Sequence, residues 1–261
     1  MTGSCALNWV LDLDGVVWLA DDPIPGASAA VAELQARDGV VVFVTNNSFL
    51  PLAEVEAKLA RHGIEATGSV VSSAMAAAAL VEAGERVLVC GGPGVVEAVE
   101  ERGAIAVAND AELDDPVDTV MVGFHRDFDY ERMRRASVAV RGGARLVATN
   151  DDATYPTPLG PIPGAGAILA GIQRASGTDA VVAGKPYRPM ADLLRRRLGS
   201  TGTVVGDRLD TDGRLARALG YRFALVLTGV TTPDAAKAAQ PSPDDVAPDL
   251  ATLVALGANS G

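Results

Sequence analysis

Short apolar runs rich in valine, isoleucine and leucine recur along the chain, and each is followed by a longer segment whose apolar residues have helical spacing. The short runs predict strands and the longer segments predict helices. The predicted strands are Trp9–Leu13, Val40–Thr45, Arg86–Cys90, Thr119–Gly123, Arg145–Thr149, Ala180–Ala183, Thr203–Val205 and Phe223–Leu227. The predicted helices are Ala27–Arg37, Leu52–His62, Ser73–Ala83, Gly94–Arg102, Tyr130–Arg141, Ala165–Ala175, Pro189–Leu198 and Gly213–Leu219. This alternation predicts an α/β protein with a mainly parallel sheet.

Four of the predicted strands run into clusters of polar residues. The clusters are Asp12-Leu13-Asp14-Gly15, Thr45-Asn46-Asn47-Ser48, Gly184-Lys185-Pro186 and Gly206-Asp207-Arg208-Leu209-Asp210-Thr211-Asp212. Ligands of open α/β sheets bind outside the carboxyl ends of the strands, so we expect the four clusters to converge on one rim. Each cluster alone also fits a turn, a helix cap or a surface loop. Their order along the chain and the strand before each one favour a shared site.

Length, composition and charge restrict the class of protein. The chain has 261 residues, of which 48% are hydrophobic and 21% charged, as expected for a soluble protein of one large domain or two modest ones. The net charge of −11 argues against binding to nucleic acid or to an anionic membrane surface. The apolar runs are too short to cross a bilayer, and the first 20 residues do not resemble a secretory signal, so we expect a cytoplasmic protein.

The inventory of reactive side chains is small. Two cysteines, Cys5 and Cys90, are too few for a disulfide framework or a cysteine-based zinc site. Two histidines, His62 and His125, exclude a site with several histidine ligands. The chemistry must therefore come mainly from carboxylates, hydroxyls, amides and Lys185, which is one of only three lysines among 22 basic residues.

In this order, and with the first one continuing through Val16-Val17-Trp18, the four clusters resemble the motifs of the haloacid dehalogenase-like phosphatase superfamily. The closest resemblance is to the subfamily with a large α/β cap between the second and third motifs, which includes NagD-type nucleotidases and the 4-nitrophenyl, phosphoglycolate and pyridoxal phosphatases. The resemblance spans nearly the whole chain. It implies a Rossmann-like core with a parallel sheet, formed by residues 1–74 and 184–261, and an inserted α/β cap of the C2 type, formed by residues 75–183.

The resemblance implies a catalytic role for three residues. Asp12 is expected to be the nucleophile that attacks phosphorus and forms an aspartyl-phosphate. Asp14 is expected to protonate the leaving oxygen and then to deprotonate the attacking water, and in an extended strand end it lies on the same side as Asp12. Lys185 is expected to supply positive charge to the nucleophile and the phosphate together.

The substrate-binding residues come from the second cluster and from the insertion. Thr45, Asn46 and Asn47 offer a hydroxyl, two amides and backbone N–H groups near a helix start, which suits the phosphoryl oxygens. Tyr155, in a loop of the insertion that resembles a cap signature, is a candidate contact for the variable part of the substrate. A packed loop tyrosine is the equally simple interpretation of Tyr155.

The acidic residues imply a divalent cation. In one small site the carboxylates of Asp12, Asp207 and Asp212 would repel one another, and a hard, oxygen-liganded Mg²⁺ would offset that repulsion. By resemblance, Asp12 and Asp207 are ligands through their carboxylates and Asp14 through its backbone carbonyl. Asp212 is expected to support the water molecules of the metal, and Asp210 fits either the site or a solvated turn.

The sequence leaves more than one activity open. The first is a Mg²⁺-dependent phosphatase for a small phosphorylated metabolite, with neither nucleic acid nor membrane as a partner and with a homodimer through the cap left open. The second is a phospho-acceptor binding or signalling protein with the same fold and no significant turnover. A third is a phosphotransferase or dehalogenase of the same superfamily. Asp14 favours the phosphatase, because an acid placed there serves ester cleavage.

Overall fold

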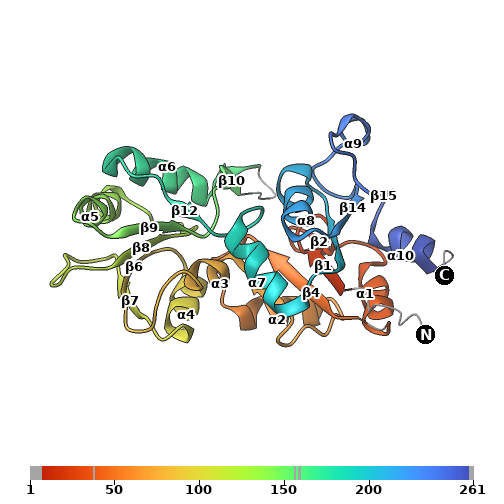
Figure 1. The fold of residues 1–261 in the computed structure, drawn as a ribbon, viewed down its shortest axis with the longest axis horizontal. Coiled ribbons are helices and arrows are strands. Elements are labelled where there is room, and N and C mark those ends of the chain that lie inside the picture. Colours follow the sequence, from red (N-terminus) through yellow and green to blue (C-terminus); the bar gives the residue numbers. More distant parts are fainter. Residues whose placement is uncertain (1–7, 38, 156, 158–159, 259–261) are drawn as a thin grey trace. The chain divides into compact units, whose positions relative to one another are not determined.

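The computed structural model describes residues 8–37, 39–155, 157 and 160–258, and the chain divides into two compact units (Figure 1). The first unit consists of Met1–Thr45, Val55–Val71 and Lys185–Gly261. The second consists of Asn46–Glu54 and Ser72–Gly184. A parallel sheet lies within each unit, so the predicted α/β class is confirmed.

The sheet of the first unit has six strands in the order β15-β14-β13-β1-β4-β5. Their bounds are β1 (Asn8–Asp12), β4 (Val41–Thr45), β5 (Val70–Ser72), β13 (Gly202–Gly206), β14 (Arg222–Val226) and β15 (Asp245–Ala247). All residues of β4 and β13 are buried, which explains why these strands appear in the sequence as continuous apolar runs. The strands at the two edges, β5 and β15, have only three residues each and were not predicted.

Helices on both sides of this sheet complete the first unit. They are α1 (Ala27–Gln35), α2 (Leu52–Arg61), which begins in the second unit, α7 (Arg188–Leu198), α8 (Arg214–Leu219), α9 (Pro233–Ala238) and α10 (Leu250–Ala258). Helix α7 buries Met190, Ala191, Leu194 and Leu198 at helical spacing. It packs against α8, and α1 packs against α10. A short hairpin of β2 (Trp18–Leu19) and β3 (Asp22–Pro23) follows β1.

The sheet of the second unit has five parallel strands in the order β12-β9-β8-β6-β7. Their bounds are β6 (Arg86–Cys90), β7 (Ile105–Ala108), β8 (Thr119–Val122), β9 (Arg145–Ala148) and β12 (Val181–Val182). Helices α5 (Tyr130–Arg141) and α6 (Ala165–Ser176) pack on each other over one face, and α3 (Ser73–Ala78) and α4 (Pro93–Glu101) pack together over the other (Figure 1). A two-stranded hairpin of β10 (Thr154–Tyr155) and β11 (Ile162–Pro163) precedes α6.

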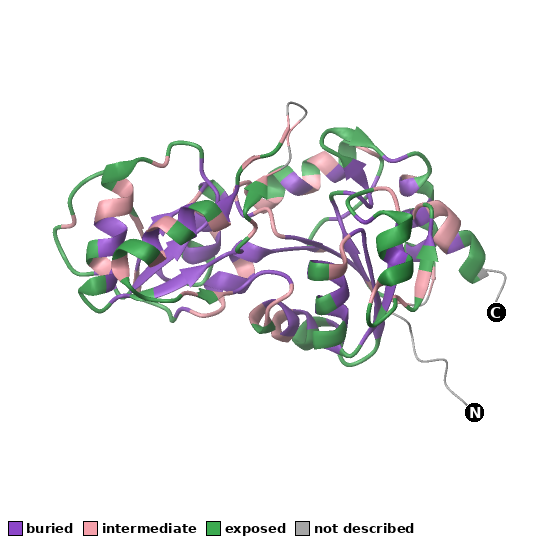
Figure 2. Cartoon of the chain, turned by 90° about the horizontal axis from the view of Figure 1, so that it is seen from above, coloured by how far each residue is buried: buried purple, intermediate pink, exposed green. Residues whose placement is uncertain are grey.

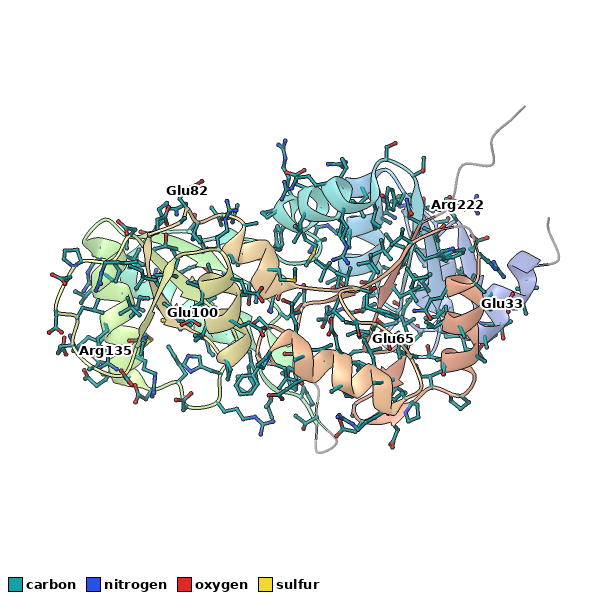
Figure 3. The ribbon with its side chains drawn as sticks, turned by 90° about the horizontal axis from the view of Figure 1, so that it is seen from below. Glu33, Glu65, Glu82, Glu100, Arg135 and Arg222 are labelled. Atoms are coloured by element: carbon teal, nitrogen blue, oxygen red, sulfur yellow. The ribbon has the colours of Figure 1, made fainter. Side chains whose placement is uncertain are left out.

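One charged side chain is buried inside the second unit. Arg135, labelled in Figure 3, donates from Nε to Asn109 Oδ1 at 3.0 Å and from a terminal nitrogen to the Asn109 carbonyl at 2.9 Å. Asn109 in turn donates to Cys90 Sγ at 2.9 Å. Burial raises the pKa of the Cys90 thiol to about 12. The thiol is therefore protonated at neutral pH and serves packing rather than nucleophilic chemistry.

Buried residues concentrate in the strands and on the inner faces of the helices, while the outer faces are exposed (Figure 2). The acidic residues labelled in Figure 3, Glu33, Glu65, Glu82 and Glu100, are all exposed. Across residues 8–258, leaving out the few positions not described, the helices are too short or too polar to span a membrane.

Candidate active site

The strand order of the first sheet creates a switch point beside β1. The chain places β4 on one side of β1, and it later returns to place β13 on the other side. Crevices of this kind, at the carboxyl ends of parallel strands, bind ligands in open α/β sheets. Asp12 is the last residue of β1, and Asp207 directly follows β13, so both side chains start from this edge.

Lys185 joins two of the acids. Its Nζ lies 2.7 Å from Asp12 Oδ1 and 2.7 Å from Asp212 Oδ1. Lys185 is 3% exposed and Asp212 is fully buried. Burial alone would lower the pKa of Lys185, but the carboxylates of Asp12 and Asp212 outweigh it and hold that pKa above its usual value. Lys185 is therefore a fixed ammonium group at neutral pH.

The acids of this site outnumber the cation that faces them. Burial, together with the nearby Asp212 carboxylate, raises the pKa of Asp12 well above its usual value, although Lys185 opposes the shift. Burial, followed by the charge of Asp212, raises the pKa of Asp207 to about 6. Burial is the larger cause in both cases, and the contribution of Asp212 reflects negative charge that Lys185 does not fully balance.

The same three acids have the geometry of a metal site. One carboxylate oxygen each of Asp12, Asp207 and Asp212 lies within 4.8 Å of the others. Among the residues that the structure describes, no other group of three acidic, histidine or cysteine side chains meets this criterion. Oxygen donors of this hardness suit Mg²⁺ or Ca²⁺, so these residues fit the cation that the sequence predicts.

The turn after β1 packs tightly on Asp207. Gly15 has φ +83°, and a Cβ there would lie 2.6 Å from Asp207 Cγ, so glycine is required both by the backbone and by the contact. On its other side, Asp207 Oδ2 accepts a hydrogen bond from the Val230 N–H at 2.6 Å, and its carbonyl accepts one from the Thr231 N–H at 3.1 Å. The Asp207 carboxylate is therefore held in one orientation.

Asp14 lies in the turn rather than in the strand. Strand β1 ends at Asp12, so the side-chain alternation used to place Asp14 does not extend to it. Its side chain is exposed, and Oδ1 accepts a hydrogen bond from Trp18 Nε1 at 3.1 Å. The protein packed around Asp14 raises its pKa, and the Lys58 ammonium and the Trp18 indole act in the opposite direction.

The second sequence cluster is divided between the two units. Thr45 is the buried last residue of β4, whose Val44 is in register with Asp12 of the neighbouring strand. Asn46 and Asn47 belong to the second unit. Helix α2 begins at Leu52, the residue at which the sequence predicts a helix to start, and a short segment separates it from Asn47.

Within the second unit, the two asparagines contact β10, the strand in which Tyr155 lies, and the segment that leads into it. Asn46 donates to Asp152 Oδ2 at 3.0 Å, and Asn47 donates to the Tyr155 hydroxyl at 3.4 Å. The Tyr155 ring stacks on Phe124, with centroids 4.9 Å apart and planes 6° from parallel. These contacts are consistent with a packed loop tyrosine, and they bring Asn46, Asn47 and Tyr155 together in one unit.

Asp210 is turned away from the acidic cluster. Its two carboxylate oxygens accept hydrogen bonds from the Arg208 guanidinium at 3.0 and 2.8 Å, and this contact lowers the pKa of Asp210. The short helical turn Leu209–Gly213 instead buries Asp212, whose Oδ2 accepts from the Arg208 N–H at 3.2 Å. Of the two candidates in this motif, the structure brings Asp212 and not Asp210 to Lys185.

Comparison with known proteins agrees with this geometry. Residues 9–105 match the model of a family described as haloacid dehalogenase-like hydrolase, and residues 182–253 match a second model described as HAD-hydrolase-like. The D-glycerol 3-phosphate phosphatase of Mycobacterium tuberculosis is 36% identical over 252 residues, which cover 94% of this chain and 70% of the relative. The chain belongs to the haloacid dehalogenase-like hydrolase family.

Solved structures of this hydrolase family support the same placement. A crystal structure of the glycerol phosphate phosphatase of Mycobacterium tuberculosis in complex with magnesium has a TM-score of 0.86 at 35% identity, covering 95% of this chain and 76% of the other. The 4-nitrophenylphosphatase of Thermotoga maritima has a TM-score of 0.85 at 31% identity, covering 95% of both chains. The NagD-like subfamily predicted from the motifs is confirmed by such neighbours.

Two parts of the site in this hydrolase were not found from its sequence. The first is the loop after β14, where Gly229 passes so close to Asp207 that a Cβ would overlap its carboxylate. The run Thr228-Gly229-Val230-Thr231 at a strand end was the available signal. The second is the role of Trp18, which contacts Asp14 through its indole nitrogen. Trp18 ends the first motif that carries the resemblance, but the sequence assigned it no function.

The second unit has a pocket of its own. It has a volume of about 440 Å³ and is lined by Phe49, Gly91, Gly92, Pro93, Val96, His125 and Asp127. None of the residues predicted for the active site lines it. The pocket is therefore not evidence for the predicted active site. The acidic cluster of the first unit remains the candidate active site.

Proposed function

We propose that this protein is a Mg²⁺-dependent phosphatase that hydrolyses small phosphomonoesters through an aspartyl-phosphate on Asp12. The observation that carries the proposal is the contact of Lys185 with both Asp12 and Asp212 at 2.7 Å. A carboxylate oxygen of Asp207 lies within 4.8 Å of one from each of these two acids. The Asp12 carboxylate beside a fixed positive charge supports its role as the nucleophile, because phosphoryl transfer needs a nucleophile and positive charge close together.

The proposed reaction has two steps. An oxygen of Asp12 attacks phosphorus, the bond from phosphorus to the ester oxygen breaks, and Asp14 gives a proton to the leaving oxygen. A water molecule then attacks the phosphorus of the aspartyl-phosphate, and Asp14 takes up its proton, which restores Asp12 and releases phosphate. Lys185 holds Asp12 in place and offsets negative charge on the transferring group.

The metal ligands follow from the donor set. Asp12 and Asp207 would hold Mg²⁺ through their carboxylates and Asp14 through its backbone carbonyl, while Asp212 supports the site from its buried position beside Lys185. When bound, Mg²⁺ neutralises the excess carboxylate charge and polarises the phosphoryl oxygens. The magnesium complex of the mycobacterial relative supports this choice of cation.

The substrate-binding part of the proposal rests on the motifs. Thr45, Asn46 and Asn47 would bind phosphoryl oxygens through hydroxyl, amide and backbone donors. We assign residues 1–74 and 184–261 to the catalytic core and residues 75–183 to a cap that recognises the rest of the substrate. A single phosphate on a small polyol, hydroxy acid or aryl group suits the acidic chain better than a polyanion.

Turnover on a substrate panel tests the proposal against its alternatives. With Mg²⁺, the wild-type protein should release many equivalents of inorganic phosphate from 4-nitrophenyl phosphate and from glycerol phosphate. A phospho-acceptor protein would instead take up one equivalent on Asp12 and stop. A phosphotransferase would release phosphate only slowly and would move it to an added sugar or alcohol. Either of these results would contradict a phosphatase.

Asp14→Asn is expected to depend on the leaving group. The nucleophile survives, but the proton donor is lost, so kcat/KM for glycerol phosphate should fall by about 10² to 10⁴. The value for 4-nitrophenyl phosphate should fall much less, because nitrophenolate leaves without protonation. Steady-state kinetics on the two substrates measure the difference. Equal losses for both would contradict the assignment of Asp14 as the acid.

Tyr155→Ala is expected to change the order of preference among substrates. If its loop contacts the variable part of the substrate, kcat/KM should change unequally across a panel of phosphomonoesters. Lys185→Ala is the comparison, because every substrate shares the phosphate and all should be affected by similar factors. If Tyr155→Ala changes kcat/KM by the same factor for every substrate, the stacking of Tyr155 on Phe124 is structural and selectivity comes from other cap residues.

A further inference from the structure

The turn after β1 brings the indole of Trp18 to the carboxylate of Asp14. Two backbone hydrogen bonds close this turn, from the Trp18 N–H to the Leu13 carbonyl at 3.2 Å and from the Gly15 N–H to the Trp18 carbonyl at 2.7 Å. Trp18 Nε1 then donates to Asp14 Oδ1 at 3.1 Å. The two backbone bonds flank Asp14 and make Asp14 and Trp18 partners in an isolated parallel β-bridge, and the indole hydrogen bond joins the side chains of the same two residues. Together these contacts hold the carboxylate in place relative to the turn.

The Trp18 ring is itself held in place. It is 4% exposed, and Lys58 Nζ lies 4.3 Å from the centre of the ring. Lys58 Nζ donates a hydrogen bond to the Ala20 carbonyl at 2.5 Å and forms an ion pair with Asp21 Oδ1 at 3.1 Å. The His62 ring lies against the indole with centroids 5.8 Å apart. A ring confined in this way keeps its N–H pointed in one direction.

We propose that Trp18 is a positioning residue that orients Asp14 for proton transfer, an inference that rests on the proposed function. An indole N–H can only donate, so Asp14 Oδ1 must present a lone pair to it. When Asp14 carries a proton, that proton is therefore placed on Oδ2. Among the described residues Oδ2 has no hydrogen-bond partner, which leaves it available to a leaving oxygen or to water.

This arrangement affects both steps of the reaction. In the first step the proton moves from Asp14 Oδ2 to the ester oxygen as the bond to phosphorus breaks. In the second step Oδ2 takes a proton from the water that attacks the aspartyl-phosphate. A carboxyl group free to rotate would spend part of its time with the wrong oxygen directed at the substrate. The indole N–H removes that freedom while the hydrogen bond persists.

Trp18→Phe tests the inference, because it removes the N–H and keeps an aromatic ring for Lys58 and His62. We expect kcat/KM for glycerol phosphate to fall about tenfold, as for the loss of one hydrogen bond to a charged group. The value for 4-nitrophenyl phosphate should change by about twofold or less, since its leaving group needs no proton. Pre-steady-state mixing with 4-nitrophenyl phosphate should show a burst of nitrophenol, because slower hydrolysis lets the aspartyl-phosphate accumulate.

Trp9→Phe is the matched control, since Trp9 in β1 is the only other tryptophan of the chain. It should leave the ratio of the two kcat/KM values unchanged. This ratio is measured within one preparation, so it does not depend on the fraction of folded enzyme. If Trp18→Phe reduces both substrates by the same factor, or leaves both unchanged, Trp18 does not position Asp14.

A closer replacement covers the case in which Trp18→Phe does not fold. In the Trp9→Phe background, incorporation of benzothienylalanine in place of tryptophan exchanges only the Trp18 N–H for sulfur and preserves the ring shape. The same selective loss on glycerol phosphate is expected, and an unchanged ratio would overturn the inference. If the wild-type enzyme hydrolyses neither substrate, the proposed function fails instead, so the two failures are distinguishable.

Discussion

Replacing Asp12 by asparagine is expected to lower phosphate release by more than about 10⁴-fold, as for loss of an enzyme nucleophile. The amide has nearly the same shape as the carboxylate, but its oxygen does not attack phosphorus. Lys185 keeps its second partner, Asp212 at 2.7 Å, so the surrounding site should stay in place. Phosphate release with saturating Mg²⁺ measures the loss, and mass spectrometry of the trapped protein should show phosphate on the wild type alone.

The stability of Asp12→Asn separates chemistry from folding. The pKa of Asp12 is raised in the folded protein, so its ionised form at neutral pH destabilises the metal-free fold. The asparagine variant in EDTA should therefore melt no lower than the wild type. Asp210→Asn is a matched control, because Asp210 pairs with Arg208 at the surface and its loss should change kcat by about twofold or less. Substantial turnover by Asp12→Asn would contradict the covalent mechanism.

The internal strands were predictable because of their burial. Residues of β4, β8 and β13 are buried on both faces, and parallel strands of this kind appear as uninterrupted apolar runs. Strand β7 (Ile105–Ala108) lies at a sheet edge with both ends exposed, and its four residues carry no clear period. Edge strands are stabilised mainly by their neighbour's backbone, which the sequence does not display.

The candidate site was predictable up to the point where side-chain direction matters. Asp12 and Asp207 lie at the carboxyl ends of β1 and β13 in one sheet, as the alternating pattern predicts. Lys185 instead follows β12, a strand of the other sheet, so the expectation that all four clusters follow strands of one sheet is wrong for Lys185, although its side chain does reach Asp12. Spacing alone could not decide between Asp210 and Asp212, since the choice depends on a helical turn that buries one and pairs the other with Arg208.

The contact of Lys58 with Trp18 shows a second limit. These residues are 40 positions apart, and their approach requires α2 to pack beside the turn after β1. Both belong to residue types that are rare in this chain, but no spacing in the sequence connects one with the other. The positioning of Asp14 therefore emerges only from the folded structure, whereas the presence of an acid two residues after Asp12 is visible in the motif.

Removing Mg²⁺ with EDTA is expected to abolish turnover reversibly and to lower the melting temperature at neutral pH. Without the cation, the carboxylates of Asp12, Asp207 and Asp212 face one ammonium group, and the resulting repulsion opposes folding. Added Mg²⁺ should restore activity and raise the melting temperature by several degrees, in proportion to its concentration relative to Kd. Activity that survives exhaustive chelation would contradict the proposed site.

The melting temperature of the metal-free protein should depend on pH in a direction that follows from the pKa of Asp207. The pKa of Asp207 is about 6 in the folded protein, above the usual value of 3.8, so between these values the folded state holds more protons than the unfolded state. The contribution of Asp207 therefore favours folding as the pH falls from about 7.5 to about 5. In EDTA, the melting temperature of the wild type should rise over this range relative to that of Asp207→Asn, which lacks the titrating group. Saturating Mg²⁺ should reduce the difference, because it stabilises the ionised carboxylate. If the two proteins differ in melting temperature by the same amount at every pH in EDTA, the pKa of Asp207 is not raised in the folded protein.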